Sequence, residues 1–189
     1  MPYKLDPAVL HECSRCGIGL APPGMFDAVT SELDRKYPGL IEKKQDWIFN
    51  NAGGAMGVLT ILYASLSEYL IFFGTPIGTE GHSGRYSADV YDFVIDGEMW
   101  CYTEGQFERV TFKPGDAAHL GKSAAKGYCI KDHAWMLEYS RGCIPLMLPF
   151  GLADSFWSTL DGRSIRRVIG NYGRLCIRNM FNRPTKPAP

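Results

Sequence analysis

In the first part of the chain, apolar and polar residues follow the spacing of an α-helix. Residues 7–37 carry apolar side chains at near-helical spacing, among them Phe26, Val29 and Leu33, and the segment 21–24 (APPG) interrupts them. Proline and glycine at that point break a helix. The pattern therefore predicts two helices in this region, one on each side of the break.

A long apolar run follows. Residues 47–79 contain a single charged side chain, Glu68, and Ala55–Phe73 is almost entirely apolar. This length approaches the roughly 20 residues of a membrane-spanning helix, but Glu68 and two serines fall inside it. We expect a buried helix running into a buried strand. A buried carboxylate needs partners, and we expect a structural role for Glu68, either pairing with an arginine or capping backbone groups between subunits.

From Tyr86 onward, the spacing of apolar residues changes from that of a helix to that of β-strands. Short runs rich in β-branched and aromatic residues are separated by turn residues, including Gly97, Gly105 and the pair Asp132 and His133. Six or seven short strands at near 10-residue spacing suggest a small antiparallel barrel or jelly roll. The segment PGDAAH, a turn followed by a strand that carries His119, is typical of cupin-type barrels.

The C-terminal region returns to helical spacing. From Ser164 the apolar residues lie on one helical stripe, and the last residues of the chain are rich in arginine, with no acidic residue after Asp161. A basic amphipathic helix is typical of a membrane-surface element. A helix that packs on the barrel and exposes a solvated basic face would show the same pattern, and both interpretations stay open.

Composition excludes some classes of protein. The 189 residues are most simply a single domain, and 20 basic and 20 acidic residues give no net charge and hence no whole-chain footprint for nucleic acid. Six scattered cysteines without a preceding signal peptide favour a reduced compartment. We expect an N-terminal helical segment over 1–46, a barrel over 47–149, amphipathic helices over 150–183 and a tail over 184–189.

Two carboxylates on the strands are candidates for acid–base chemistry. On a strand, Glu138 shares a face with Met136 and Ala134, which suits a cavity wall. An ion pair between Glu138 and an arginine, Arg141 or Arg85, is the competing interpretation. Two carboxyl groups held together in an apolar barrel cannot both ionise easily. One would stay protonated, and the pair could then protonate an alkene or bind an amine.

The partner carboxylate lies in the run SADVYDFVID. In a regular strand Asp92 and Asp96 share one face and Asp89 points to the other. Asp96 precedes Gly97, which is ordinary turn chemistry. Either Asp92 or Asp89 is therefore the expected partner of Glu138.

No metal or nucleotide motif accompanies these acids. A cupin-type barrel can hold a metal, but His82 and His119 are too far apart in sequence to form a local ligand pair. The only CxxC, Cys13 to Cys16, has no second pair at the spacing of a zinc ribbon. We therefore expect neither a metal nor a cofactor.

Four long segments of the chain resemble the family of the fungal C-8 (Δ8–Δ7) sterol isomerase and the sigma-1 receptor. The matching segments are WIFNNAGGAMG (47–57), ASLSEYLIFFGTPIGTEGHSGRY (64–86), WMLEYSRG (135–142) and IPLMLPFGLADSFWSTLD (144–161). The similarity covers roughly residues 4 to 180, and the sequences GTEGH and LPFG are more similar to the isomerase than to the receptor.

The resemblance implies an α+β, mainly β fold. A cupin-like antiparallel β-barrel would be flanked by N-terminal helices and by two C-terminal amphipathic helices that lie on an endoplasmic-reticulum-type membrane. The family's N-terminal transmembrane anchor is expected to be absent, because this chain begins almost where the soluble part should begin. The resemblance also implies a homotrimer and a lipophilic pocket inside the barrel that is reached from the membrane.

The resemblance also implies pocket residues. Glu138 matches the shared pocket glutamate, Asp92 the receptor's second carboxylate, and Asp89 an acid of both branches. Further residues are expected to line or border the pocket: Tyr69, Trp47, Phe73, His119 and Trp135.

The resulting hypothesis is a sterol Δ8–Δ7 isomerase that works without a cofactor. Glu138 would protonate the alkene of a sterol or another polycyclic lipid, and the paired aspartate with aromatic faces would hold the tertiary carbocation. The alternative is a non-enzymatic, sigma-receptor-like protein in which the same carboxylate binds the ammonium group of a cationic amphiphile.

Overall fold

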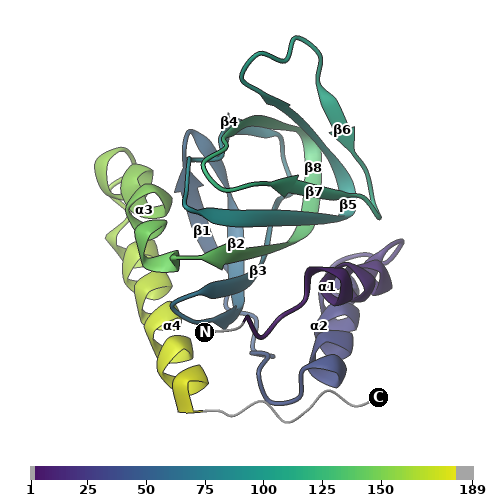
Figure 1. The fold of residues 1–189 in the computed structure, drawn as a ribbon, viewed down its shortest axis with the longest axis vertical. Helices are drawn as coiled ribbons and strands as arrows, with labels where there is room; N and C mark the ends of the chain where they lie inside the picture. Colours follow the sequence, from purple (N-terminus) through teal and green to yellow (C-terminus); the bar gives the residue numbers. More distant parts are fainter. Residues whose placement is uncertain (1–2, 182–189) are drawn as a thin grey trace.

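The computed structural model describes residues 3–181. Within this range one antiparallel sheet of eight strands lies between two pairs of helices, α1 with α2 and α3 with α4 (Figure 1). The helices are α1 Pro7–Ser14, α2 Gly24–Lys36, α3 Leu148–Trp157 and α4 Gly162–Phe181, with 3-10 turns at Arg15–Gly17 and Ile144–Leu146. The strands are β1 Ile48–Ala52, β2 Ala55–Ala64, β3 Glu68–Thr75, β4 Thr79–His82, β5 Ala88–Thr103, β6 Val110–Phe112, β7 Ala117–Leu120 and β8 Lys126–Gly142. The expected tail at 184–189 lies outside the described residues.

The sheet is built around its two longest strands. Strands β5 and β8 pair antiparallel from Ala88 opposite Gly142 to Thr103 opposite Lys126. The strand order is β1-β2-β3-β8-β5-β6, while β4 pairs with β8 and β7 pairs with β5. The expected mainly β fold with flanking helices is confirmed. Within residues 3–181, however, the sheet does not close into a barrel. Strand β1 pairs with β2 alone, and helix α3 packs against β1.

The expected helix in the apolar run is wrong. Ala55–Phe73 forms the antiparallel strands β2 and β3, joined by a turn in which the Ser65 hydroxyl accepts the backbone N–H of Glu68 at 3.0 Å. Both faces of β3 are buried, with Ile71 and Phe73 in one core cluster and Phe72 in another. A strand buried on both faces loses its polar alternation and shows a continuous apolar run.

The expected series of six or seven short strands after Tyr86 is also wrong. Gly97 and the pair Asp132 and His133 do not end strands, because β5 and β8 continue through them. At Gly97 the register shifts, its φ is +76°, and a Cβ atom there would lie 2.1 Å from the carbonyl oxygen of His133. Glycine therefore allows the long strands to bend together instead of ending.

The two N-terminal helices form as the sequence predicts. Asp6 caps α1 by accepting the N–H of Ala8 at 2.8 Å. The apolar stripe of α2, including Phe26 and Leu33, packs with Phe72 on the outer face of the sheet. This face is therefore covered by protein, which leaves the opposite face free to line a cavity.

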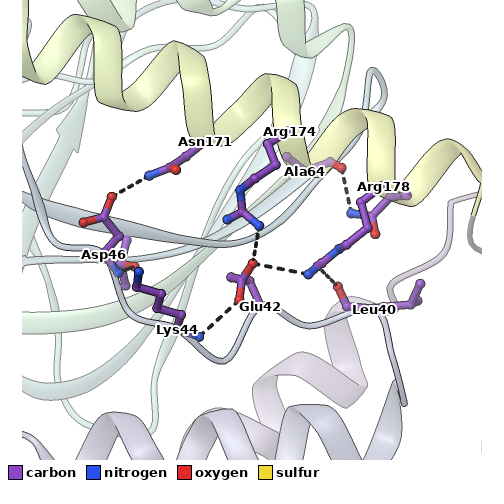
Figure 2. A network of polar contacts seen from close by, with 10 residues as sticks. Leu40, Glu42, Lys44, Asp46, Ala64, Asn171, Arg174 and Arg178 are labelled. Atoms are coloured by element: carbon purple, nitrogen blue, oxygen red, sulfur yellow. Dashed lines mark hydrogen bonds and ion pairs between the residues drawn. The ribbon is translucent and has the colours of Figure 1, made fainter.

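Helix α4 forms where the apolar stripe predicts it and is tied to the sheet by polar contacts. The Tyr172 hydroxyl donates to the carbonyl of Ser65 at 2.9 Å, and the Asn179 amide donates to the carbonyl of Ala64 at 3.0 Å. Figure 2 shows Arg174 and Arg178 converging on the Glu42 carboxylate. Part of the basic face of α4 is thus engaged within the chain.

Helices α3 and α4 and the segments that flank α3 expose large apolar side chains, and α4 also exposes Arg163 and Arg166. The most exposed large apolar side chains here are Leu146, Trp157, Leu160, Met180 and Phe181. Over residues 3–181, every helix is too short or too polar to cross a bilayer.

Candidate active site in the cavity of the sheet

The inner face of the sheet and helices α3 and α4 enclose an apolar cavity. Its empty volume is about 1180 Å³, including its opening to solvent. Most of the wall is aliphatic or aromatic, with Leu59, Ile71 and Met136 from the sheet and Val168 from α4. The polar side chains in the wall are Asn50, Tyr69, His82, Ser83, Tyr86, Asp92, Lys126, Tyr128, Glu138 and Tyr172. A large apolar cavity with a few convergent polar groups is the usual form of a small-molecule site.

Two carboxylates face each other in this wall. Asp92 on β5 lies directly opposite Glu138 on β8 in the antiparallel register, so their Cβ atoms are neighbours on the same face of the sheet. Asp92 is 4% exposed. The competing interpretation, an ion pair between Glu138 and an arginine, is wrong. Arg141 contacts Asp89, and Arg85 pairs with Glu104.

Glu138 has the properties of a proton donor. Burial raises its pKa to about 7, and the negative charge of Asp92 acts in the same direction. A hydrogen bond donated by the Tyr69 hydroxyl and the positive charge of Lys126 oppose the shift. Near neutral pH, Glu138 therefore exists in both its protonated and its ionised form.

Asp92 has a different partner. The Lys126 ammonium group donates to the Asp92 carboxylate, and Lys126 is only 8% exposed. Burial alone would lower the pKa of Lys126, but the charge of Asp92, its hydrogen bond to Lys126 and the smaller effects of Cys101 and Glu138 together outweigh burial, so the pKa is raised. Lys126 therefore stays charged beside Asp92.

Sequence reasoning missed Lys126, although a signal was present. Lys126, Tyr128, Met136 and Glu138 all occupy even positions of β8 and all line the cavity. The two-residue period thus continues from Glu138 back to Lys126. Dividing the strand at Asp132 and His133 hid this relationship.

Three of the four tyrosines in the cavity wall are influenced by the charge of Glu138. Burial is the main cause that raises the pKa of Tyr69, Tyr86 and Tyr128, and the charge of Glu138 adds to it in each case. All three phenols are therefore neutral near pH 7. They offer hydroxyl donors and electron-rich ring faces, which attract cations.

The structure brings four of the predicted site residues to the cavity wall: Glu138, Asp92, Tyr69 and Phe73. Trp47 and Trp135 lie on the opposite face of the sheet, where their rings pack around Phe26 at centroid distances of 4.7 and 5.2 Å.

Asp89 and His119 also lie outside the cavity. The His119 ring stacks on Tyr91 at 4.4 Å, and its Nε2 lies 3.4 Å from the Asp89 carboxylate. Asp89 faces away from Asp92 because the two differ by an odd number of positions on the same strand.

Glu68 has the structural role that the sequence suggests, but within the chain. It is 1% exposed and accepts the backbone N–H groups of Lys4 and Leu5, at 2.9 and 3.1 Å, and the hydroxyl of Tyr139 at 2.8 Å. It therefore fixes the N-terminal segment to the sheet and takes no part in the cavity. Among residues 3–181, metal-ligating side chains do not gather in groups of three or more.

Comparison with known sequences gives matches along almost the whole chain. Residues 1–184 match a family model described as "ERG2 and Sigma1 receptor like protein". A protein of Dictyostelium discoideum, named "Protein erg2 homolog", is 49% identical over 95% of this chain and 77% of its own length. The Aspergillus fumigatus protein named "C-8 sterol isomerase erg2" is 44% identical over 96% of this chain and 77% of its own length.

A second kind of name occurs among the relatives. The Gallus gallus protein named "Sigma non-opioid intracellular receptor 1" is 41% identical over 84% of this chain and 72% of its own length. Among solved structures, an RmlC-like cupin from Shewanella frigidimarina aligns with a TM-score of 0.46 at 12% identity, covering 57% of this chain and 94% of that one.

Proposed function

The chain belongs to the family of ERG2 and sigma-1 receptor-like proteins, and from this membership we propose that it is a C-8 sterol isomerase. It would move a sterol double bond from Δ8 to Δ7. The observation that carries the proposal is the facing pair Asp92 and Glu138 in an apolar cavity, with the pKa of Glu138 raised to about 7. Relatives named C-8 sterol isomerase support the reaction type.

The first step is proton transfer from Glu138 to C9 of the alkene. The Glu138 O–H bond breaks, a C9–H bond forms, and the alkene electrons leave a tertiary cation at C8. A carboxyl group with a pKa near 7 carries its proton in a large fraction of molecules at neutral pH and is still acidic enough to give it up.

The second step is stabilisation and collapse of the cation. The negative charge of Asp92 and the ring faces of Tyr69, Tyr86 and Tyr128 surround the space where the charge develops. Asp92 accepts the proton from C7, and the C–H electrons form the Δ7 bond. Transfer of this proton from Asp92 back to Glu138, its neighbour across the strand pair, returns the site to its starting state.

Glu138 and Asp92 together account for every proton that the reaction moves. One proton is added and one is removed, and the sterol is neither oxidised nor reduced. The chemistry therefore calls for no electron acceptor or donor, and the residues of the cavity supply both the acid and the base.

The decisive experiment uses purified protein and a Δ8-sterol in D₂O. Isomerase activity predicts a Δ7-sterol with one deuterium at C9, because the Glu138 proton exchanges with solvent between turnovers. Mass spectrometry and NMR would detect the label. A folded protein that yields no Δ7 product would overturn the proposal.

A specific observation also favours a second candidate, the binding of cationic amphiphiles. A relative named as a sigma receptor is 41% identical to this chain, and two carboxylates in an apolar cavity suit an ammonium group with a hydrocarbon tail. Saturable amine binding without any turnover of a Δ8-sterol would favour this function over the isomerase.

We also propose that the protein is a homotrimer peripheral to a membrane of the endoplasmic-reticulum type. Exposed apolar side chains at the end of α3 and in the segment between α3 and α4, Trp157 and Leu160, support contact with a lipid surface. Exposed Tyr102 and Phe107 around the β5–β6 hairpin offer an apolar patch for another subunit. Analytical ultracentrifugation that finds only monomers would exclude the trimer.

A further inference from the structure

The tyrosines of the cavity wall differ in what their hydroxyl groups contact. The hydroxyls of Tyr69 and Tyr172 donate to a carboxylate and to a backbone carbonyl of the protein. Tyr86 and Tyr128 also line the cavity and are half-buried, but within residues 3–181 neither hydroxyl makes a hydrogen bond to the protein. A hydroxyl group in an apolar cavity needs a partner, so these two are available to a polar group of a ligand.

Tyr128 is held between two neighbouring strands. It lies on β8 opposite Gly81 of β4 and opposite Cys101 of β5. Its side chain lines the same cavity as that of Glu138, which lies an even number of positions further along the strand. The pairing on both sides therefore fixes the point at which this phenol enters the cavity.

Tyr86 enters the cavity from the connection between β4 and β5. Its carbonyl accepts the N–H of Ser123 at 2.7 Å, and its ring packs edge-to-face on Phe150 of α3 with 5.6 Å between the centroids. Gly84 leaves room for the hydroxyl, since a Cβ atom at Gly84 would lie 2.1 Å from the hydroxyl oxygen. The phenol is therefore confined at its backbone, at its ring and at its hydroxyl end.

The two phenols lie in the same part of the cavity as the acids. Burial is the largest cause that raises the pKa of Tyr86, and the charges of Glu138 and Tyr128 add to it. Burial likewise raises the pKa of Tyr128, and the charges of Glu138 and Asp92 act in the same direction. Because such effects weaken with distance, the two hydroxyls lie close to each other and to Glu138.

An alcohol matches these two groups. A neutral phenol can both donate and accept a hydrogen bond, so one phenol can donate to an alcohol oxygen while the other accepts the proton of the alcohol. A sterol carries a hydroxyl group at C3, and the A and B rings separate it from the Δ8 double bond.

We propose that Tyr86 and Tyr128 form the subsite for the 3-hydroxyl group of the sterol and so position C9 in front of Glu138. The inference deepens the proposed isomerase, and its catalytic part rests on that function. It also defines the substrate class as sterols with a free hydroxyl group. A steryl ester has no O–H to donate, and a 3-deoxysterol leaves both phenols without a partner.

Equilibrium binding of two saturated compounds tests the subsite without turnover. Radiolabelled cholestanol carries the 3-hydroxyl group, cholestane is its 3-deoxy counterpart, and both are delivered from cyclodextrin. The double variant Y86F/Y128F keeps both ring faces and should bind cholestanol at least about tenfold more weakly than the wild type, with its cholestane affinity unchanged. Unchanged cholestanol affinity, equal losses for both ligands, or a wild type that binds neither ligand would overturn the inference.

Tyr172→Phe is the matched control in the same cavity. The Tyr172 hydroxyl already donates to the carbonyl of Ser65, so its loss should change the affinities for the two ligands by the same factor. If Tyr172→Phe weakened cholestanol binding alone, the assignment to Tyr86 and Tyr128 would fail.

Thermal unfolding separates a ligand subsite from a structural role. Within the described part of the chain the hydroxyls of Tyr86 and Tyr128 have no protein partner, so Y86F and Y128F should unfold at the wild-type temperature or above it. A lower unfolding temperature for both variants would show that the hydroxyls hold the fold instead of a ligand.

Turnover separates this inference from the proposed function. If the wild type isomerises a Δ8-sterol, kcat/KM of Y86F/Y128F should fall at least about tenfold for the 3-hydroxy substrate and stay at the wild-type value for the 3-deoxy Δ8 substrate. Equal falls for both substrates would overturn the inference. If the wild type does not isomerise, the isomerase proposal fails, while the binding of cholestanol and cholestane still decides the role of the two tyrosines.

Discussion

Asp92 and Glu138 lie directly opposite each other on β5 and β8, yet Asp92 is bound by a buried ammonium group and Glu138 by a neutral phenol. This asymmetry separates the properties of two carboxyl groups that share one cavity. The Asp92 carboxylate pairs with the Lys126 ammonium group, whereas burial raises the pKa of Glu138 to about 7. In a catalytic pair of acids, the acid and base roles are assigned by environments that make the pKa values of the two groups differ.

Replacing Glu138 by glutamine should abolish the isomerase. The amide keeps the size of the side chain but has no proton to give, and we expect kcat/KM to fall by at least about 100-fold in the conversion of a Δ8-sterol to its Δ7 isomer. Glu108→Gln, at an exposed position, is the matched control and should keep full activity. A well-folded Glu138→Gln protein with wild-type turnover would rule out Glu138 as the acid.

The rate should fall as the pH rises above about 7, because the acid must be protonated and the pKa of Glu138 is about 7. The Tyr69 hydrogen bond lowers this pKa. In Tyr69→Phe, which keeps the ring face, the alkaline limb of kcat/KM should therefore move to higher pH. The measurement is a pH–rate profile of both proteins, and coincident profiles would argue against control of Glu138 by Tyr69.

The same group should make stability depend on pH. The folded pKa of Glu138, about 7, lies above its ordinary value of 4.5, so the fold favours the protonated form. This contribution is complete below about pH 4.5 and is lost as the pH rises through 7, a change on the order of 3 kcal/mol at most. Glu138→Gln cannot ionise. Urea unfolding from pH 5 to 8 should therefore show the wild type losing stability relative to the variant, and parallel curves would contradict the buried acid.

The strand faces that carry the acids could be predicted from the sequence because they depend on a local rule, although the choice between Asp92 and Asp89 as the partner of Glu138 could not. Side chains alternate along a strand, so Glu138 falls on the same face as Met136, and Asp92 on the face opposite to Asp89. Helices α1, α2 and α4 could be predicted for a similar reason, since each buries a single stripe against the sheet.

Features that depend on what covers each face could not be predicted in this way. The β2–β3 hairpin is apolar on both sides because α2 packs outside it and the cavity lies inside, and its residues have no period that separates a strand from a helix. Trp47 and Trp135 are large aromatic residues of the kind that contacts a ligand, but they pack against Phe26 in the hydrophobic core between α2 and the sheet. The ion pair between Lys126 and Asp92 joins residues that are far apart in sequence. They are not opposite each other in the strand register either, since Lys126 lies opposite Thr103, so only the folded structure reveals the pair.

Glu68 should prove essential to stability, although it lies outside the cavity. Glu68→Ala leaves the N–H groups of Lys4 and Leu5 and the hydroxyl of Tyr139 without this acceptor, and we expect a loss of about 3 kcal/mol. Tyr139→Phe removes one donor and leaves Glu68 with its backbone partners, which should cost about 1 kcal/mol. Thermal unfolding measures both, and a smaller loss for Glu68→Ala than for Tyr139→Phe would contradict this role.

Contact with a lipid surface should depend on the apolar side of α3 and α4. Trp157 and Leu160 are 81% and 79% exposed. Transfer of an exposed apolar side chain from water into the interface of a bilayer is favourable. The double variant Trp157→Ser and Leu160→Ser should sediment with phosphatidylcholine vesicles at least about tenfold less than the wild type.

The matched control lies away from these helices. Phe107→Ser removes a fully exposed apolar side chain at the β5–β6 hairpin and should leave vesicle binding unchanged if α3 and α4 are the contact. Equal losses in both variants would point to nonspecific adsorption of apolar groups. Neutral vesicles serve this test because α4 also exposes basic side chains, Arg163 and Arg166. A lipid without net charge offers these little attraction, so the apolar side chains must supply the binding.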